Sequence, residues 1–196
     1  MGLEHLHPIP DDERLLHLTN FPIIMTQINR TQPALVSPDD STRRLTRIGG
    51  VSPDARRFTV SNEVSTIAQF RAVDYGLENC SLQFSLQLPL GAEGLGVGNN
   101  ASTSTVDVWL LDAPMKLDVA RLSWDKRPKR RQLFETMRMP WGSAESGGRS
   151  FACPWNSMQS FEFACSTDGQ DCQLDFWQDP KRPYLGVTMR QSSSLV

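Results

Sequence analysis

The chain has 196 residues and a formal net charge of -2, from 20 basic and 22 acidic residues. This near balance excludes the strongly basic surface of a dedicated nucleic-acid-binding protein, so no nucleic-acid partner is expected. The apolar stretches fall far short of the roughly 20 residues that a membrane-spanning helix needs, which predicts a soluble protein without a membrane partner.

The first 55 residues contain six prolines that would interrupt any regular element. They predict an irregular, Pro-rich N-terminal extension over residues 1–55, followed by one folded domain over residues 56–196. Within the extension, the acidic start of the segment Asp11–Leu18 predicts two helical turns.

From Phe58 onward, short β-type runs alternate with turn-forming residues, a spacing typical of packed sheets. The clearest run is 81–88, where apolar residues alternate strictly with Ser and Gln. Glycines between 91 and 98 predict a flexible loop, since no helix pattern follows them as a dinucleotide site requires. The predicted strands are 58–60, 66–73, 81–88, 106–111, 132–138, 160–165, 172–178 and 185–190. The predicted fold class is therefore all-β, an antiparallel, jelly-roll-like β-sandwich.

Two aromatic runs, 161–165 and 172–177, meet a six-residue segment of turn formers, each with a cysteine at its end. They predict a β-hairpin closed by a Cys165–Cys172 disulfide, which leaves Cys80 to pair with Cys153. Four cysteines allow three connectivities, and four reduced thiols are the alternative. The cysteines lack Cys-x-x-Cys spacing, so no metal site is expected.

Three N-glycosylation triplets begin at Asn29, Asn79 and Asn100. Together with the paired cysteines they favour a secreted or cell-surface protein. Cytoplasmic localisation is the alternative, because Met1–Leu6 lacks the hydrophobic stretch of a signal peptide. The start of the sequence thus predicts either an intracellular protein or a chain trimmed at this end.

The three histidines lie within the first 17 residues, so the predicted β domain has none. This disfavours a histidine-dependent nucleophile and histidine-ligated metal, and no cofactor is expected. Three carboxylates lie on predicted strands or strand ends, Asp112, Glu135 and Glu162. A facing pair of them could act as general acid and base, but they are expected on solvated faces. The basic run 126–131 is interpreted as a solvated loop rather than a phosphate-binding patch.

Two predicted strands share an Asp-x-Trp pattern. Period-two alternation places Asp107 with Trp109 on one face of their strand, and Asp175 with Trp177 on one face of theirs, opposite apolar residues. A carboxylate beside an exposed aromatic ring is typical of carbohydrate sites, where the ring stacks on a sugar and the acid accepts hydroxyl hydrogen bonds. The alternative is that these tryptophans only fill sheet surfaces.

Several segments, taken together, resemble one family, the fungal ubiquitin 3 binding protein (But-two) C-terminal domain. The matching segments are Cys80–Phe84 with Leu88–Pro89, Val106–Trp109 leading to Asp112–Pro114, Ser123–Pro128, Phe151–Cys153, and the cysteine turn that leads to Leu185–Val187. The resemblance covers about residues 58–191. It implies a fungal source, a β-sandwich, and commonly a secreted or cell-surface product with paired cysteines. No site residue is carried over from the family.

Three functional hypotheses follow. The first is a non-catalytic module that binds a small molecule or glycan, such as fungal wall carbohydrate, through Trp109, Trp177, Asp107 and Asp175, with Trp124 and Tyr184 as further candidate ligand-binding residues. The second is a cofactor-independent cyclase or isomerase of secondary metabolism. Its pocket would be lined by Trp124, Trp141, Trp155, Tyr184, Met137 and Met158. The third is a ubiquitin-pathway adaptor, which predicts reduced cysteines.

Overall fold

The structure of the chain is a computed structural model that describes residues 17–38, 44–46, 49–51, 56–86, 105–138, 146–167, 172–178 and 185–194. Within these ranges the chain forms thirteen strands and one short 3-10 helix, Val119–Arg121. All the strand pairs of these ranges are antiparallel. The prediction of an all-β antiparallel sandwich is confirmed.

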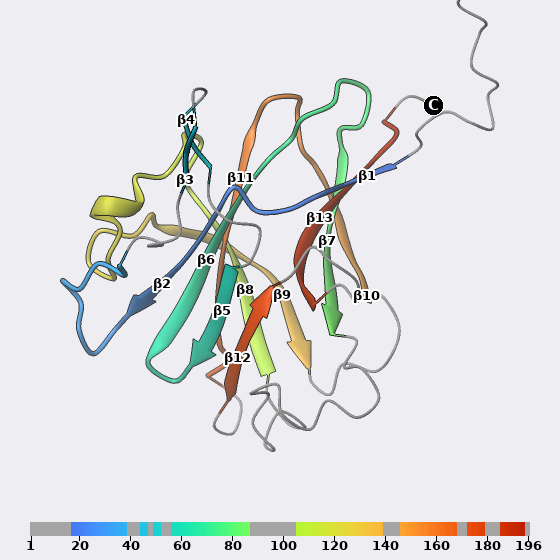
Figure 1. Ribbon diagram of the computed structural model, residues 1–196. Helices are drawn as coiled ribbons and strands as arrows, with labels where there is room; N and C mark the ends of the chain where they lie inside the picture. Colours follow the sequence, from blue (N-terminus) through green and yellow to red (C-terminus); the bar gives the residue numbers. More distant parts are fainter. Residues whose placement is uncertain are drawn as a thin grey trace, which may run out of the picture.

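One layer of the sandwich is a five-stranded sheet with the order β2-β6-β11-β8-β9 (Figure 1). Its strands are β2 (Ile24–Asn29), β6 (Val64–Arg71), β11 (Met158–Cys165), β8 (Thr105–Leu111) and β9 (Arg130–Arg138). The central strand β11 is hydrogen-bonded along both edges, to β6 and to β8.

The opposite layer combines a four-stranded sheet and a two-stranded ribbon. The four-stranded sheet has the order β1-β13-β7-β10, from β1 (His17–Asn20), β13 (Leu185–Ser192), β7 (Asn79–Leu86) and β10 (Ser146–Ala152). The ribbon pairs β12 (Gln173–Gln178) with β5 (Arg56–Ser61), and it joins β13 through the buried Gln178, whose Oε1 accepts from the Val187 N–H at 3.0 Å. A separate small hairpin pairs β3 (Arg44–Thr46) with β4 (Gly49–Val51).

The core between the layers is built from phenylalanine rings. Phe163 of β11 meets Phe84 of β7 at 5.5 Å between ring centroids and Phe58 of β5 at 5.4 Å, so one ring contacts all three sheets. Phe58 in turn stacks on Phe176 of β12 at 4.9 Å. Each buried phenylalanine contributes about 1.5–3 kcal/mol relative to an exposed one. These contacts hold the ribbon and both sheets around one core.

Each of the eight predicted strands corresponds to an observed one, with boundaries that differ by a few residues. The structure adds four strands, β1 to β4, inside the segment 1–55 that was expected to be irregular. Pro22 and Pro33 flank β2 rather than interrupt it, and buried residues alternate along it at Ile24, Thr26 and Ile28. Ile28 packs in a small apolar cluster that is separate from the main core. Of the helical turns predicted over 11–18, His17 and Leu18 belong to β1, and the rest lies outside the described residues.

Strand β10 was not predicted because its Ser-Gly-Gly-Arg-Ser sequence has no apolar alternation. Its pairing with β7 is irregular between Gly147 and Ser150. A Cβ placed on Gly148 would lie 2.5 Å from the backbone oxygen of Leu82, so this close approach requires glycine.

The predicted hairpin between β11 and β12 is wrong, although its disulfide is present. Because both edges of β11 already carry partners, β12 has no free edge there and pairs with β5 instead. The Cys165–Cys172 bond, with 5.9 Å between the two Cα atoms, spans the point where the chain passes from the five-stranded sheet to the ribbon.

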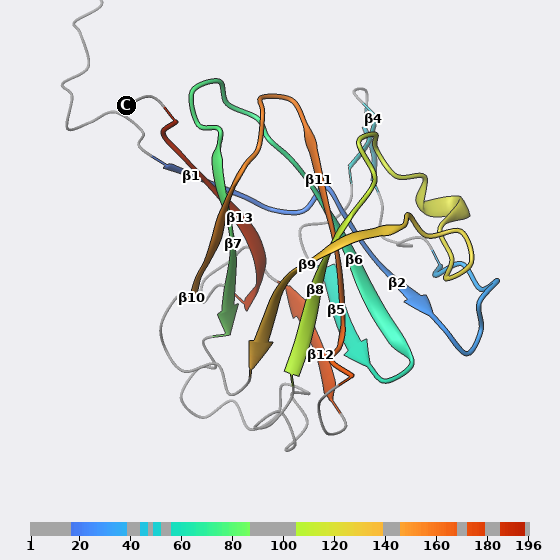
Figure 2. The same ribbon diagram turned by 180° about the vertical axis from the view of Figure 1, so that it is seen from behind.

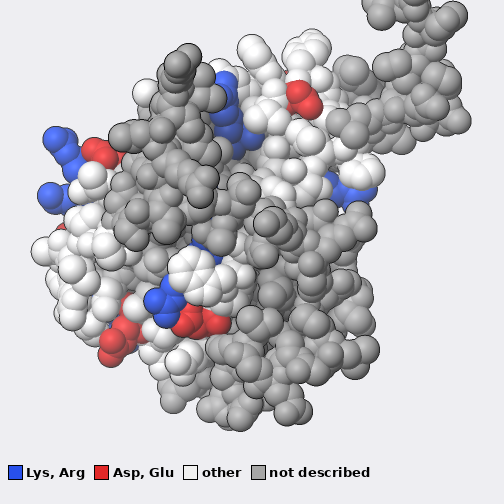
Figure 3. Space-filling model, viewed as in Figure 1, with Lys and Arg blue, Asp and Glu red and all other residues white. Residues whose placement is uncertain are grey.

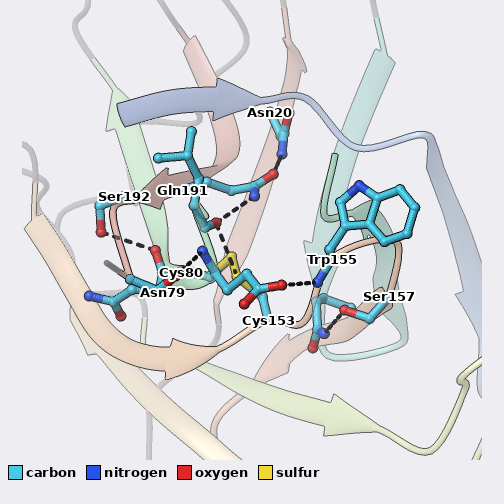
Figure 4. The surroundings of a disulfide bond; sticks show 12 residues. Asn20, Asn79, Cys80, Cys153, Trp155, Ser157, Gln191 and Ser192 are labelled. Atoms are coloured by element: carbon cyan, nitrogen blue, oxygen red, sulfur yellow. Dashed lines mark hydrogen bonds between the residues drawn. A yellow bond between two sulfur atoms is a disulfide. The ribbon is translucent and has the colours of Figure 1, made fainter. Parts of the chain in front are cut away.

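The predicted Cys80–Cys153 pairing is confirmed, and this disulfide is completely buried (Figure 4). The neighbouring side chain of Gln191, also buried, connects three segments. Its Nε2 donates to the Leu77 oxygen at 2.7 Å, and its Oε1 accepts from the Val73 N–H at 3.0 Å and from the side chain of Asn20. The N-terminal strand β1 is thereby fixed to the same end of the sandwich.

Candidate ligand-binding face

The outer face of the β12–β5 ribbon carries one of the two predicted Asp-x-Trp pairs. Leu174 and Phe176 are buried in the core, so Asp175 and Trp177 point outward from β12. The indole of Trp177 is 61% exposed. A ring exposed to this extent belongs to an open face and not to a closed cavity.

Residues of β5 complete this face. In the antiparallel register Trp177 lies opposite Arg57, and Asp175 lies opposite Thr59. Directly opposed residues project to the same side of a sheet, so the four side chains form one surface, here called the ribbon face. The views in Figures 1 and 2 place the ribbon on one side of the sandwich and β8 on the other.

The polar groups of the ribbon face are held in a fixed arrangement. Arg57 donates to both oxygens of Asp175, from Nε at 2.8 Å and from Nη2 at 2.6 Å, and the Thr59 hydroxyl donates to Oδ1 at 3.0 Å. The hydrogen bonds from Arg57 lower the pKa of Asp175 against the opposing effect of partial burial. The same pair raises the pKa of Arg57. The carboxylate therefore stays ionised and correctly oriented without a ligand.

This arrangement matches the chemistry of a polyol ligand. The indole offers a flat apolar surface for the C–H face of a sugar, and a fixed carboxylate, guanidinium and hydroxyl beside it can exchange hydrogen bonds with sugar hydroxyls. The Arg57 side chain is 53% exposed and that of Asp175 is 35% exposed, so both are within reach of a ligand.

The other Asp-x-Trp pair lies on the far side of the core. Val106 and Val108 point into the core, which turns Asp107 and Trp109 to the outer face of the five-stranded sheet. Asp107 is nevertheless only 8% exposed and accepts from the Thr136 hydroxyl at 2.7 Å. The structure thus does not bring Asp107 and Trp109 together with Asp175 and Trp177.

Trp109 is partly covered by a network centred on Glu162. This glutamate is fully buried, and Arg130 donates to both its oxygens at 3.0 and 2.7 Å, while the Arg127 Nε lies 3.7 Å away. The Arg130 guanidinium lies 4.8 Å from the centre of the Trp109 ring, and that of Arg127 lies 3.8 Å from the Trp124 ring. Two aromatic rings therefore flank two arginines that share one carboxylate.

This network corrects two predictions. Glu162 does not lie on a solvated face, and two arginines of the basic run 126–131 are structural rather than free. A signal was present in the sequence, because Glu162 lies between Phe161 and Phe163 in an apolar strand, and a charge buried in such a strand requires partners. Only the tertiary structure shows which residues are these partners.

The residues proposed to line a cyclase pocket are dispersed. Trp124 packs on a small apolar cluster outside the five-stranded sheet, with Ile67 and Leu122, while Met137 packs against the main core. Met158 begins β11, and Trp155 is on the loop that precedes it. The remaining two, Trp141 and Tyr184, lie outside the described residues, and Tyr184 was also a ligand-binding candidate.

A second exposed aromatic group lies at the end of the sandwich near the Cys80–Cys153 disulfide, and it includes Trp155 of the proposed cyclase pocket. Tyr75 is 80% exposed and Trp155 is 56% exposed. The Trp155 indole N–H donates to the Val73 oxygen at 3.1 Å, and its backbone N–H donates to Glu78 Oε1 at 2.9 Å (Figure 4). This group provides an exposed tryptophan away from the ribbon face, which lies towards the other end (Figure 1).

Charged side chains on the side shown in Figure 3 lie in small separate groups of both signs. Among the described residues, no group of three or more His, Cys, Asp or Glu side chains is arranged to hold a metal ion. The same part of the chain contains no helix that is both long enough and apolar enough to cross a membrane.

Comparison of the chain with protein-family models and with curated proteins finds no match. The resemblance to the But-two C-terminal domain therefore stays a prediction.

Proposed function

We propose that the protein is a non-catalytic β-sandwich module that binds carbohydrate through the ribbon face. The observation that carries the proposal is the exposed Trp177 indole beside an ion pair that is already oriented, Asp175 with Arg57. Preorganised groups bind with a smaller loss of side-chain entropy than mobile ones. Fungal wall glycan is the proposed ligand class, because the But-two resemblance implies a fungal source and commonly a secreted or cell-surface product.

Secretion or display at the cell surface fits this proposal. Both cysteine pairs form disulfides, which persist in oxidising compartments. The adaptor alternative requires reduced cysteines and so receives less support. The cyclase alternative requires a shared aromatic pocket, and its described residues are spread over three regions.

The test uses soluble β-glucan and chitin oligosaccharides as ligands in titration calorimetry with Trp177→Ala. Covering about 100 Å² of the ring at about 25 cal/mol per Å² gives roughly 2.5 kcal/mol, so we expect binding to weaken by more than about tenfold. Trp155→Ala is the matched control, because that tryptophan is similarly exposed and should leave binding unchanged. Absence of binding at millimolar sugar, or equal losses in both variants, would refute the proposal.

A further inference from the structure

The triplet Asn29-Arg30-Thr31 forms a local turn that involves the acceptor amide of a glycosylation motif. Asn29 is the last residue of β2, and its Oδ1 accepts from the Thr31 backbone N–H at 2.8 Å and from the Thr31 hydroxyl at 2.7 Å. The Thr31 hydroxyl also lies 3.5 Å from Glu63 Oε2. Within the described part of the chain, the Asn29 Nδ2 atom makes no hydrogen bond.

This turn can form before the domain folds, because its hydrogen bonds connect residues only two apart. The threonine hydroxyl donates to the amide oxygen and draws electron density away from the amide. The nitrogen then loses a proton more readily as it attacks an electrophilic carbon. The geometry thus couples the hydroxyl of the third residue to the reactivity of the first.

We propose that Asn29 is the preferred N-glycosylation site among the described residues when the chain passes through a secretory pathway. The donor is an oligosaccharide linked to a lipid pyrophosphate. The Asn29 Nδ2 forms a bond to the anomeric carbon and gives up one proton, while the bond from that carbon to the pyrophosphate oxygen breaks and the pyrophosphate leaves with the electron pair.

The surroundings of Asn29 leave room for a glycan. β2 is a terminal strand of the five-stranded sheet, and the segment that follows Asn29, residues 30–35, is exposed. A bulky hydrophilic group at this position extends into solvent and does not displace any packed side chain.

The second motif in the described residues, Asn79-Cys80-Ser81, is also exposed at its asparagine but lacks this local turn. Asn79 begins β7, which pairs on both edges with β10 and β13. The Ser81 hydroxyl accepts from the Gln83 side chain at 3.0 Å instead of contacting the Asn79 side chain. The Ser192 hydroxyl does reach Asn79, but it donates to the backbone oxygen at 3.0 Å and not to the side-chain amide. The motif at Asn100 lies outside the described residues.

The experiment expresses the full chain behind a cleavable secretion signal in yeast. Peptide N-glycosidase in heavy-oxygen water labels each formerly glycosylated asparagine, and mass spectrometry gives the occupancy at each position. We expect Asn29 to be modified in most secreted molecules, and to be modified more often than Asn79. Thr31→Ser, which keeps the hydroxyl, should retain the modification.

Thr31→Ala and Asn29→Gln should abolish the modification at residue 29 and leave that at Asn79 unchanged, while circular dichroism shows that each variant is folded. An unmodified Asn29 peptide in secreted protein, or higher occupancy at Asn79, would overturn the proposal. So would retention of the glycan in Thr31→Ala. The result is independent of carbohydrate binding by the ribbon face.

Discussion

At the scale of single residues, two ion pairs of this protein differ in their exposure. The Asp175–Arg57 pair is on the ribbon face in partial contact with water, whereas Glu162 is fully buried between two arginines. A partly exposed pair contributes little to stability, while removal of one partner of a buried charge has a large effect.

Asp175→Asn should change stability in a pH-dependent way. The folded-state pKa of Asp175 is lowered below 3.8. Its contribution is therefore fully present above the unfolded-state pKa and is lost as pH falls through the folded-state value. Because the pair is partly exposed, we expect wild type to exceed the variant by less than about 1 kcal/mol at neutral pH.

Urea unfolding of both proteins at neutral pH and at a series of acidic values measures this difference, which should shrink as the pH falls. Asp125→Asn, at another exposed aspartate, provides the matched control. A difference that grows on acidification would contradict the assigned role of Asp175.

Arg130→Ala should destabilise the protein strongly, because it leaves the buried Glu162 with one more distant arginine and uncovers the Trp109 ring. We expect a loss of about 3 kcal/mol in the free energy of unfolding. The adjacent Arg131 is exposed, and Arg131→Ala should stay within about 0.5 kcal/mol of wild type. Urea unfolding midpoints of wild type and the two variants measure these differences, provided that the dependence of the free energy on urea concentration is the same in all three. Equal stabilities would show that Arg130 does not support the buried Glu162.

At the scale of elements, the two disulfides connect different kinds of neighbours. Cys80–Cys153 joins β7 to the segment after β10, two elements 73 residues apart in sequence. Cys165–Cys172 joins the end of β11 to the start of β12, which are neighbours in sequence but members of different sheets. The first closes a long loop and the second a short one.

Replacing each pair with serines should therefore have unequal effects. The chain-entropy relation gives about 4 kcal/mol for Cys80→Ser with Cys153→Ser and about 2.5 kcal/mol for Cys165→Ser with Cys172→Ser. Thermal unfolding of the two double variants, compared with wild type, measures the order. A larger loss from the short loop would show that the passage between the sheets, rather than loop entropy, determines the effect.

At the scale of the whole molecule, the aromatic core joins the layers into one unit. Phe163 contacts rings from the four-stranded sheet and from the ribbon, while its own strand is central in the five-stranded sheet. Each layer buries its apolar face against the other, so separating the layers would expose the apolar side chains of both. We therefore expect the sheets to unfold together.

Phe163→Ala tests this cooperativity. We expect a loss of about 3–5 kcal/mol and an equal shift of two unfolding signals, far-UV circular dichroism and tryptophan fluorescence. The fluorescence reports on the outer surfaces, where Trp109, Trp155 and Trp177 lie, and the dichroism reports on all strands. Transitions that separate in wild type or in the variant would show that the layers are independent.

Prediction from sequence succeeded where the signal was local. Alternation identified eight strands, turned Leu174 and Phe176 inward, and turned Trp177 and Asp175 outward. It failed for β10, where a glycine-rich sequence follows β7 irregularly, and for β2, where the prolines flank the strand. Each of these two strands forms because it pairs with a strand distant in sequence. The sequence of one strand does not indicate which strand will be its partner.

The sequence by itself determined the fold class, favoured the two disulfide pairs, and separated the inward from the outward residues of β12. These follow from period-two side-chain geometry and from cysteine spacing. Only the tertiary structure decided that β11 and β12 belong to different sheets, and that the two Asp-x-Trp pairs lie on opposite sides of the core. It also decided that the buried Glu162 forms ion pairs with two arginines. The physical reason is that hydrogen-bonding edges are filled by distant strands, and long-range pairing determines which side chains meet.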